Sequence, residues 1–362
     1  MYLKKSKTIV IKIGSSILID NNKKIRKKWL SEFTKDISNL LKQKKNIILV
    51  CSGAIALGCK KLNLTKQKLK IDKSQAVASI GQIELMNLLN KTFSSKKINL
   101  SQILLTLEDT EKRRRAINAK RTLENLFKLG FVPVVNENDS IATTEIKYGD
   151  NDRLAARVAQ IIGADTLVIF SDVDGLYDKS KNIVKTVNKI DEKVYSLVDK
   201  SKNVYGSGGI STKLDAAKIC MNSGCHMFIA NGNKENSIKK MIKEKIFTHF
   251  IPKISSLDAR KKWIISSLKS SGIIHIDSGA AKALLNGKSL LAAGITKVQG
   301  SFDKGENVLI VDHNENHLAR GLISFNSNEI GKIKGKQSKE IEKILGYLSK
   351  SEIIHKDDMV KL

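Results

Sequence analysis

Two short polar clusters near the middle of the chain combine acids with amides: NEND, which ends at Asp139, and GDND, which ends at Asp152. Asp139 and Asn151 are of the types that bind the ammonium and carboxylate groups of a small substrate. Asp150 or Asp152 could then hold lysine side chains in place. Asn and Asp also cap helices, and the stretch after the second cluster has a helical pattern. Both interpretations stay open for Asp150, whereas a binding role is favoured for Asp139.

Two lysines occupy positions where a lysine side chain is energetically unfavourable. Lys12 interrupts the apolar run TIVIKI, and burying its ammonium group without a partner would be strongly unfavourable. Lys213 ends GGISTK at the start of a predicted helix, where a cation opposes the helix dipole. Both placements are explained if an anionic group lies between the two side chains. A protein that catalyses phosphoryl transfer mainly has to neutralise the charge of the transferred group. The two lysines therefore indicate phosphoryl transfer.

Three glycine-rich turns accompany these side chains: KIGSS at 12–16, SGAIALG at 52–58 and YGSGGISTK at 205–213. Each lies near a predicted helix start, where outward N–H groups and the helix dipole favour phosphate oxygens. None matches the Walker pattern GxxxxGK[ST], and no well-placed GxGxxG is present. A single turn of this kind is weak support, but three at strand–helix junctions favour a phosphate site.

The elements that must position these residues alternate between strand and helix. Short apolar runs such as TIVIKI and DTLVIFSD predict buried parallel strands, and amphipathic stretches at 27–41 and 75–93 predict helices. We therefore expect an α/β fold with a mainly parallel sheet sandwiched between helices. Ligands collect beyond the carboxyl ends of the strands in such sheets. Lys12, Ser52 and Ser171 all fall at predicted strand ends.

The character of the sequence changes near residue 257. SLDARKKWIISSLK predicts a connector over 256–269, and shorter apolar runs such as NVLIVDH and ARGLISF follow it, with frequent glycines. These runs predict a small β-rich, barrel-like domain over 270–362, with one helix at SGAAKALLNG. The α/β domain is accordingly predicted over 1–255.

Composition excludes several classes of protein. The 362 residues are 41% apolar, which is ordinary for a globular protein, and no run is long and apolar enough for a membrane span. The first residues have no signal-like apolar run, because Lys12 interrupts the one candidate, so a cytoplasmic location is expected. The four cysteines lack CxxC spacing and predict buried free thiols. No His, Cys and acid pattern completes a metal site, so no metal ligand is assigned.

The net charge of +28 raises the alternative of a nucleic-acid-binding protein. Residues 1–130 carry 29 basic and 9 acidic residues, a net of +20, whereas 131–255 carry a net of +3 and 256–362 a net of +5. The excess is mostly lysine at separated positions, which favours a compositional bias over a dedicated polyanion surface. The dense run EKRRRAINAKR (111–121) stays open as a site for an anionic ligand.

Taken together, VIKIGSS, VCSGAIALG, VPVVNENDSIATTEIKYGDND, SDVDGLYD and GSGGISTKLDAAK resemble the glutamate 5-kinase branch of the amino acid kinase family. The resemblance covers roughly residues 6–255. The segment IDSGAAKALLNGKSLLAAGITKVQGSF is similar to the PUA module that often follows this kinase domain. The order of the motifs and the appended module make the match specific.

The resemblance implies ATP-dependent phosphorylation of the L-glutamate γ-carboxylate, the first step of proline biosynthesis. It also implies Mg²⁺ as a cofactor, proline as a feedback inhibitor, and assembly into dimers or tetramers. By motif position, it implies ATP contacts from Lys12, Ser171, Asp172, Ser207, Gly208, Gly209, Ile210, Ser211, Thr212 and Lys213, glutamate contacts from Ser52, Gly53, Ala54, Asp139 and Asn151, and catalytic roles for Lys12, Lys213, Asp150 and Asp152.

The residues favour direct in-line transfer on their own account. No Cys–His or Ser–His arrangement suggests a covalent intermediate, and a carboxylate acceptor is ionised at neutral pH, so no general base is needed. Within the class, the rivals are an acetylglutamate kinase or an aspartate kinase, against which the clusters at Asp139 and Asn151 discriminate. A different class, an RNA-binding or RNA-modifying protein, stays open because of the PUA-like tail and the excess of basic over acidic residues. The tail, however, has no aromatic pair spaced for base stacking.

Overall fold

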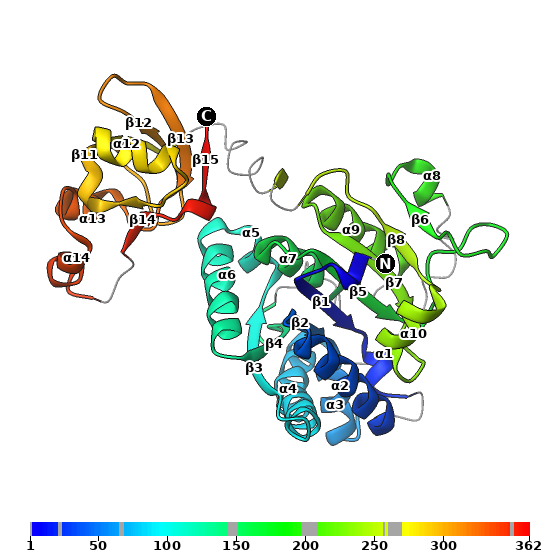
Figure 1. Cartoon of the computed structure of the whole chain (residues 1–362). Helices are drawn as coiled ribbons and strands as arrows, with labels where there is room; N and C mark the ends of the chain where they lie inside the picture. Colours follow the sequence, from blue (N-terminus) through cyan, green and yellow to red (C-terminus); the bar gives the residue numbers. More distant parts are fainter. Residues whose placement is uncertain are drawn as a thin grey trace. The chain divides into compact units, whose positions relative to one another are not determined.

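The architecture is that of a computed structural model (Figure 1), in which residues 2–20, 24–64, 69–142, 151–196, 209–255, 258–259, 270–347 and 351–362 are described. The chain divides into two compact units, Met1–Ser256 and Leu257–Leu362. Most of the expected connector over 256–269 lies outside the described residues. Within the described ranges, none of the helices combines the length and apolar character that crossing a membrane requires.

Unit 1 is built on an eight-stranded sheet with the strand order β3-β4-β2-β1-β5-β7-β8-β6. Neighbouring strands are parallel except for the pair β7 and β8, which is antiparallel. The mainly parallel sheet expected from the sequence is therefore confirmed. The strands are β1 (Thr8–Ile13), β2 (Asn46–Cys51), β3 (Asn99–Leu105), β4 (Phe131–Glu137), β5 (Thr166–Ser171), β6 (Thr186–Val187), β7 (His226–Asn231) and β8 (Thr248–Phe250).

Helices cover both faces of this sheet, as Figure 1 shows. One apolar core lies between the sheet and α2, α3, α4 and α10, and a second lies between the sheet and α6, α7 and α9. The four cysteines are buried and form no disulfide bond, as expected. The helices of unit 1 are α1 (Ser15–Leu18), α2 (Lys27–Lys42), α3 (Ala54–Lys61), α4 (Ile71–Ser94), α5 (Leu107–Glu111), α6 (Arg113–Lys128), α7 (Asn151–Ile162), α8 (Glu192–Tyr195), α9 (Ile210–Asn222) and α10 (Ser237–Glu244).

The two-residue period of the strands decides which polar side chain meets which layer of helices. On β1, Ile9 and Ile11 pack in the core of α2 and α4, whereas Val10 packs in the core of α7 and α9. Successive side chains of a strand point to opposite faces, so Lys12 follows Val10 toward α7 and α9. On β4, Val134 belongs to the α2–α4 core, which places Asn136 on the α4 face.

Unit 2 contains a five-stranded sheet, order β11-β9-β12-β13-β15, and a two-stranded sheet of β10 and β14. Its apolar core holds residues from both sheets and from the helices. The unit is β-rich, as expected. Its strands are β9 (Gly272–Ile276), β10 (Leu290–Leu291), β11 (Ile295–Gly300), β12 (Asn307–Val311), β13 (His317–Leu322), β14 (Glu352–Ile354) and β15 (Met359–Lys361).

The expectation of a single helix in unit 2 was wrong. Besides α12 (Ser278–Leu285), the chain forms α13 (Ser327–Ile333) and α14 (Ser338–Leu345). A capping box begins α13, since the Asn326 side chain accepts from the Glu329 N–H and the Glu329 carboxylate accepts from the Asn326 N–H. Such reciprocal capping stabilises short helices, and its spacing was visible in the sequence.

Candidate active site

A buried carboxylate joins two lysines from different parts of the sheet edge. The Nζ atom of Lys12 lies 2.7 Å from one oxygen of Asp152, and that of Lys213 lies 3.1 Å from the other. Thr212 adds a hydroxyl 3.2 Å from Asp152. Lys12 comes from β1, Asp152 from the first turn of α7, and Lys213 from the first turns of α9. The side chains of the two lysines and Asp152 are less than a tenth exposed, so the ion pairs form away from bulk water.

The charge of this triad is not balanced. Burial raises the pKa of Asp152, but the ammonium groups of Lys12 and Lys213 outweigh burial and hold that pKa below its ordinary value. Asp152 is therefore ionised at neutral pH, and the triad carries one positive charge more than it carries negative charge. A buried excess of positive charge is costly unless an anion compensates it. The arrangement suits an anionic ligand at this end of the sheet.

Glycine turns bring backbone close to these ammonium groups. A Cβ atom on Gly14 would lie 3.8 Å from the Nζ atom of Lys12 and 3.8 Å from the carbonyl oxygen of Phe170, so the turn after β1 lies beside the end of β5. Gly53, which begins α3, has φ of 123°, a conformation that L side chains rarely adopt. Gly209 is the N-cap residue of α9 and supplies no side-chain cap to the first N–H groups of that helix.

A second cluster is a chain of side-chain amides. The Asn151 amide nitrogen lies 2.8 Å from the Ser52 hydroxyl and 2.9 Å from the Asn136 amide oxygen. Asn136 in turn donates to the amide oxygen of Gln82 on α4, at 2.7 Å. The chain crosses the sheet edge from the α7 face to the α4 face, as the strand period requires. It adjoins the triad, because Asn151 and Asp152 are neighbours at the start of α7.

Two atoms of this amide chain are buried without a partner among the described residues: the oxygen of Asn151 and the nitrogen of Gln82. Buried polar atoms are nearly always hydrogen-bonded, so such atoms call for an explanation. The acceptor belongs to one end of the chain and the donor to the other, with Asn136 between them. An acceptor and a donor are the groups that bind the ammonium and carboxylate of an amino acid. The arrangement could therefore hold a zwitterionic ligand next to the charged triad.

Close packing of two glycine-bearing helices brings Gln82 to this place. A Cβ atom on Gly81 would lie 1.7 Å from the carbonyl oxygen of Ala54, and one on Gly58 would lie 2.1 Å from the carbonyl oxygen of Val77. The backbones of α3 and α4 thus touch where both helices lack side chains. This contact holds Gln82, the next residue on α4, against the sheet end.

The end of β5 carries further polar groups. The hydroxyl of Ser171 donates to the Asp172 carboxylate at 3.0 Å. The Asp174 carboxylate accepts from the side-chain amide of Asn231 at 3.1 Å and from the Tyr177 hydroxyl at 3.2 Å. Because β1 and β7 both pair with β5, these groups share the carboxyl edge of the sheet with Lys12.

The structure brings together some of the sequence-predicted residues and leaves others apart. Asp139 lies half-buried in the turn after β4, and Ile210 and Ser211 form the first turn of α9 beside Gly209. Asp150, Ser207 and Gly208 lie outside the described residues. The residues in direct contact are Lys12, Asp152, Thr212 and Lys213 in the triad, and Ser52 and Asn151 in the amide chain.

Sequence reasoning missed Gln82 and assigned no role to Asn136, although Asn136 stands in the NEND cluster. The signal for Gln82 was its position, because it lies in the stripe of α4 that also buries Val77, Ala78 and Leu85. A polar residue inside an apolar helical stripe needs a buried partner. That pattern could have placed Gln82 at the site.

Three cations of the basic run at 111–121 form ion pairs with nearby acids. Arg115 pairs with Asp109 at 2.8 Å, Lys120 pairs with Glu124 at 3.4 Å, and Lys112 pairs with Glu108. These are exposed pairs along α5 and α6, of the kind that contributes little to stability. They leave less free positive charge for an anion here than the run suggested.

Known proteins match both units. Residues 7–231 match the amino acid kinase family, and residues 272–345 match the PUA domain. The chain is 64% identical over 368 residues to the glutamate 5-kinase of Pelagibacter ubique, with all of both chains covered. It is 43% identical to that of Paramagnetospirillum magneticum, over 98% of both chains, and 45% identical to that of Bartonella henselae, over 98% of this chain and 95% of the relative. The chain therefore belongs to the amino acid kinase family, in its glutamate 5-kinase branch, with a PUA domain after the kinase domain.

Proposed function

We propose that this protein transfers the γ-phosphoryl group of ATP to the γ-carboxylate of L-glutamate, the first step of proline biosynthesis. The observation that carries the proposal is the buried Lys12–Asp152–Lys213 triad beside the amide chain of Asn151. The triad offers excess positive charge to a phosphoryl group, and the amide chain offers a buried donor and a buried acceptor to an amino acid. The relatives are named glutamate 5-kinases, which supports glutamate as the acceptor.

On the nucleotide side, the phosphates of ATP would lie at the start of α9. The N–H groups of the first turn and the helix dipole at that end favour phosphate oxygens. Lys12 and Lys213 would neutralise the charge of the phosphoryl group during its transfer, and Asp152 would hold both ammonium groups in position. Ser171 and Asp172, at the end of β5, would contact the nucleotide. By motif position, Ser207 and Gly208 are proposed to contact ATP as well.

On the acceptor side, glutamate would bind between the turn at Ser52 and the amide chain. The oxygen of Asn151 suits its ammonium group, and the nitrogen of Gln82 suits its α-carboxylate. Asp139 would add a carboxylate for the ammonium group. The γ-carboxylate has an ordinary pKa near 4.3, so it attacks as an ionised nucleophile without a general base. Attack in line with the leaving ADP oxygen needs positioning and charge neutralisation alone.

Mg²⁺ would enter with ATP. Among the described residues, no three His, Cys, Asp or Glu side chains gather as a dedicated metal cage. Mg²⁺ commonly binds through one or two carboxylates together with substrate phosphates. Asp172 supplies a carboxylate at the nucleotide end of β5, so the oxygen donors here fit the ion. Its chemistry would be to offset the charge on the phosphate oxygens during transfer.

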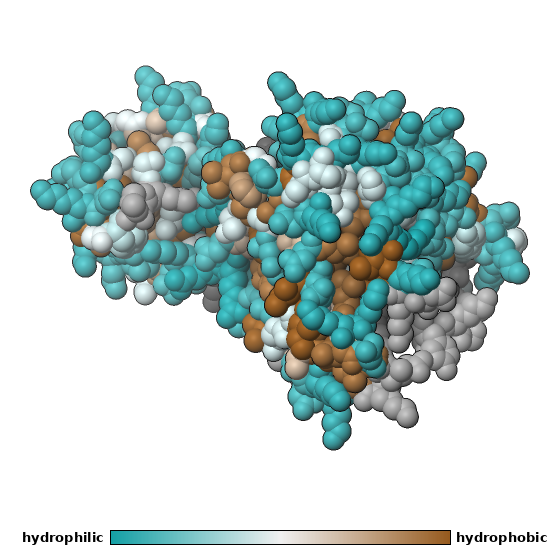
Figure 2. Space-filling model, turned by 90° about the horizontal axis from the view of Figure 1, so that it is seen from below, coloured by the Kyte–Doolittle hydropathy of each residue, from teal (hydrophilic) through white to brown (hydrophobic). Residues whose placement is uncertain are grey.

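The resemblance also proposes a cytoplasmic enzyme that assembles into dimers or tetramers and is inhibited by proline. Exposed apolar side chains support assembly: Ile83 on α4 is 63% exposed, and Leu62 and Ile71 beside α3 and α4 are also exposed. Figure 2, seen from the side of these helices, shows apolar surface gathered on unit 1. Apolar patches on soluble proteins often mark contacts with other chains. Proline, a small amino acid, could occupy part of the amide chain in place of glutamate.

The proposal predicts an acyl phosphate as product, which hydroxylamine converts to a hydroxamate. Incubation with ATP, Mg²⁺, L-glutamate and hydroxylamine should therefore give γ-glutamyl hydroxamate in step with ADP release. ADP release without hydroxamate would mean that water or another group accepts the phosphoryl group, and it would overturn the assigned acceptor.

A further inference from the structure

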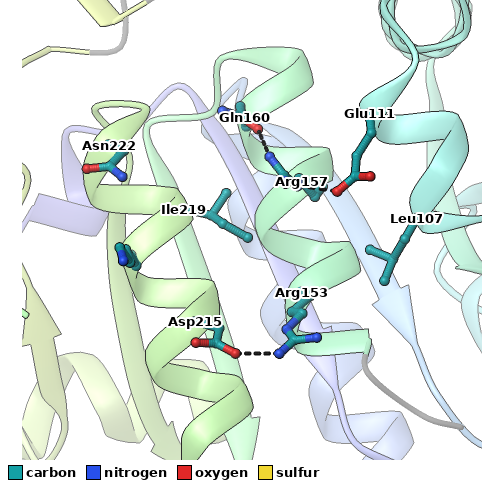
Figure 3. A pocket seen from close by; sticks show the side chains of 9 residues that line it. Leu107, Glu111, Arg153, Arg157, Gln160, Asp215, Ile219 and Asn222 are labelled. Carbon is teal, nitrogen blue, oxygen red and sulfur yellow. Dashed lines mark hydrogen bonds and ion pairs between the residues drawn. The ribbon is translucent and has the colours of Figure 1, made fainter. Parts of the chain in front are cut away.

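A groove lies on the outer side of the helices that carry the triad (Figure 3). It runs between α9 on one side and α7 and α5 on the other, and its volume is about 500 Å³. It shares no residue with the amide chain or the triad. Its lining residues are Leu107, Glu111, Arg153, Arg157, Gln160, Asp215, Lys218, Ile219 and Asn222.

Two ion pairs brace the groove and satisfy both of its acids. Figure 3 shows Arg153 and Asp215 joined across α7 and α9, and Arg157 joined to Glu111 of α5. Arg157 also donates to the side-chain oxygen of Gln160 at 3.1 Å. The Arg157–Glu111 distance is 3.0 Å, and these two contacts occupy only part of the five N–H donors of its guanidinium. Arg157 therefore keeps donors for a further anion.

Lys218 is the uncompensated charge of the groove. Within the described part of the chain, its ammonium group has no acidic partner and no hydrogen-bond acceptor. With Arg153 and Arg157 it gives three cations against two carboxylates, both of which are already engaged. The amides of Gln160 and Asn222 line the same groove and add donors, and Leu107 and Ile219 add apolar wall. The groove thus offers directed donors, a net positive charge and an apolar surface in one concavity.

We propose that this groove is a binding site for a small organic anion, a carboxylic acid or a phosphate ester, whose oxyanion lies between Lys218 and Arg157. A lone inorganic ion would leave most of the volume empty, so the ligand carries a further polar or apolar part against Asn222 and Ile219. The excess of cations favours an anion over a zwitterion, because both groove carboxylates are held by arginines.

The site goes beyond the phosphoryl transfer proposed above and does not depend on it. It would nevertheless be coupled to that reaction, because α7 carries Asp152 one residue before Arg153, and α9 carries Lys213 two residues before Asp215. The same two helices are therefore bridged by an ion pair inside the active site and by another in the groove. A ligand that binds the cations of the groove would change the distance between α7 and α9, and with it the geometry of the active site.

The test follows the side-chain methyl signal of Ile219 by NMR in the full chain, assigned with Ile219→Val. Saturating non-hydrolysable ATP analogue and L-glutamate occupy the proposed active site. Succinate and glycerol 3-phosphate are titrated as carboxylate and phosphate probes, with succinamide and glycerol as their uncharged counterparts. Lys218→Glu reverses the charge of the groove lysine, and Lys243→Glu, at an exposed lysine in the last turn of α10, is the matched control. Circular dichroism checks that both variants fold.

We expect a saturable shift of the Ile219 methyl signal with at least one anionic probe and none with its uncharged counterpart. The probe that saturates identifies the carboxylate or the phosphate ester as the ligand class. Lys218→Glu should weaken that binding by at least about tenfold, and Lys243→Glu should leave it unchanged. The site is refuted if neither anion gives a saturable shift, if the uncharged counterparts shift the signal equally, or if Lys218→Glu binds as tightly as the unsubstituted chain.

Discussion

The ammonium group of Lys12 lies 2.7 Å from the carboxylate of Asp152, and both side chains are buried. Side chains alternate between the two faces of the sheet along β1, so that of Lys12 points toward α7. Asp152 lies in the first turn of α7 and contacts it there. Lys213 approaches the opposite oxygen of the same carboxylate at 3.1 Å. One acid thus fixes two cations from separate elements at the carboxyl end of the sheet, which is the arrangement that phosphoryl transfer requires.

Asp152→Asn should destabilise unit 1 and abolish most turnover. The change leaves two buried ammonium groups without their carboxylate, and breaking a buried ion pair from one side costs about 3–5 kcal/mol. Urea unfolding followed by circular dichroism measures the loss. Asp72→Asn, an exposed acid in the first turn of α4, is the control and should change the free energy of unfolding by less than about 0.5 kcal/mol.

Lys213→Ala separates catalysis from folding in the same triad. Asp152 then keeps Lys12 as a partner, so the fold should persist while turnover falls by about 10²–10³-fold. A variant that retains turnover would show that Lys213 does not act on the transferred group.

Gln82→Leu should raise the KM for glutamate and leave the KM for ATP unchanged. The substitution removes the buried donor that we assign to the substrate carboxylate and also the acceptor of Asn136. The loss of one buried hydrogen bond to a charged group corresponds to about 10–100-fold in KM. Steady-state kinetics with each substrate varied in turn gives both constants, and Gln102→Leu, at an exposed position of β3, serves as the control. Equal changes in both constants would contradict the assignment.

Gly81→Ala should destabilise the packing of α4 on α3. The added methyl group would meet the Ala54 backbone at 1.7 Å, and backbone cannot move aside as a flexible side chain can. Overpacking of this kind costs about 1–3 kcal/mol. Gly331→Ala, in α13, has open space around the new Cβ atom and should be neutral or stabilising by up to about 1 kcal/mol. If urea unfolding gives the two variants the same stability, the close helix contact does not govern this packing.

The stability of unit 1 should fall as the pH drops from about 6.5 toward 4. His226 and His249 lie with ring nitrogens 2.9 Å apart. Burial, and then the neighbouring His226, lowers the pKa of His249 to about 4, and burial also lowers the pKa of His226. The folded state therefore prefers neutral rings and the unfolded chain takes up protons first, so this contribution is complete above about pH 6.5 and is lost below it.

His249→Phe tests this dependence, because Phe keeps a ring against Phe228 but cannot be protonated. Urea unfolding at pH 7.5, 6.5 and 5.5 should show a flatter profile for the variant than for the unsubstituted chain. Parallel profiles would place the pH dependence in other groups.

The short-range sequence pattern predicted those site residues whose positions depend only on the ends of nearby strands and helices. Lys12 and Ser52 were found because apolar strand runs end beside them, and Lys213 because it stands at a helix start. The role of Gln82 was not predicted, because it depends on which helix packs against β4. That long-range contact cannot be read from the sequence of α4 alone. The pairing of Asp152 with both lysines was likewise left open between Asp150 and Asp152. The helices α13 and α14 were not predicted, because both are short and the sequence signal for each lies largely in its capping residues.

The central claim concerns the acceptor, and a coupled ADP-release assay with ATP and Mg²⁺ tests it most directly. L-glutamate, N-acetylglutamate and L-aspartate are compared, each with and without proline. The account predicts turnover confined to L-glutamate and suppressed by proline. Turnover on N-acetylglutamate or L-aspartate in preference to L-glutamate would contradict the roles given to Asn151, Gln82 and Asp139.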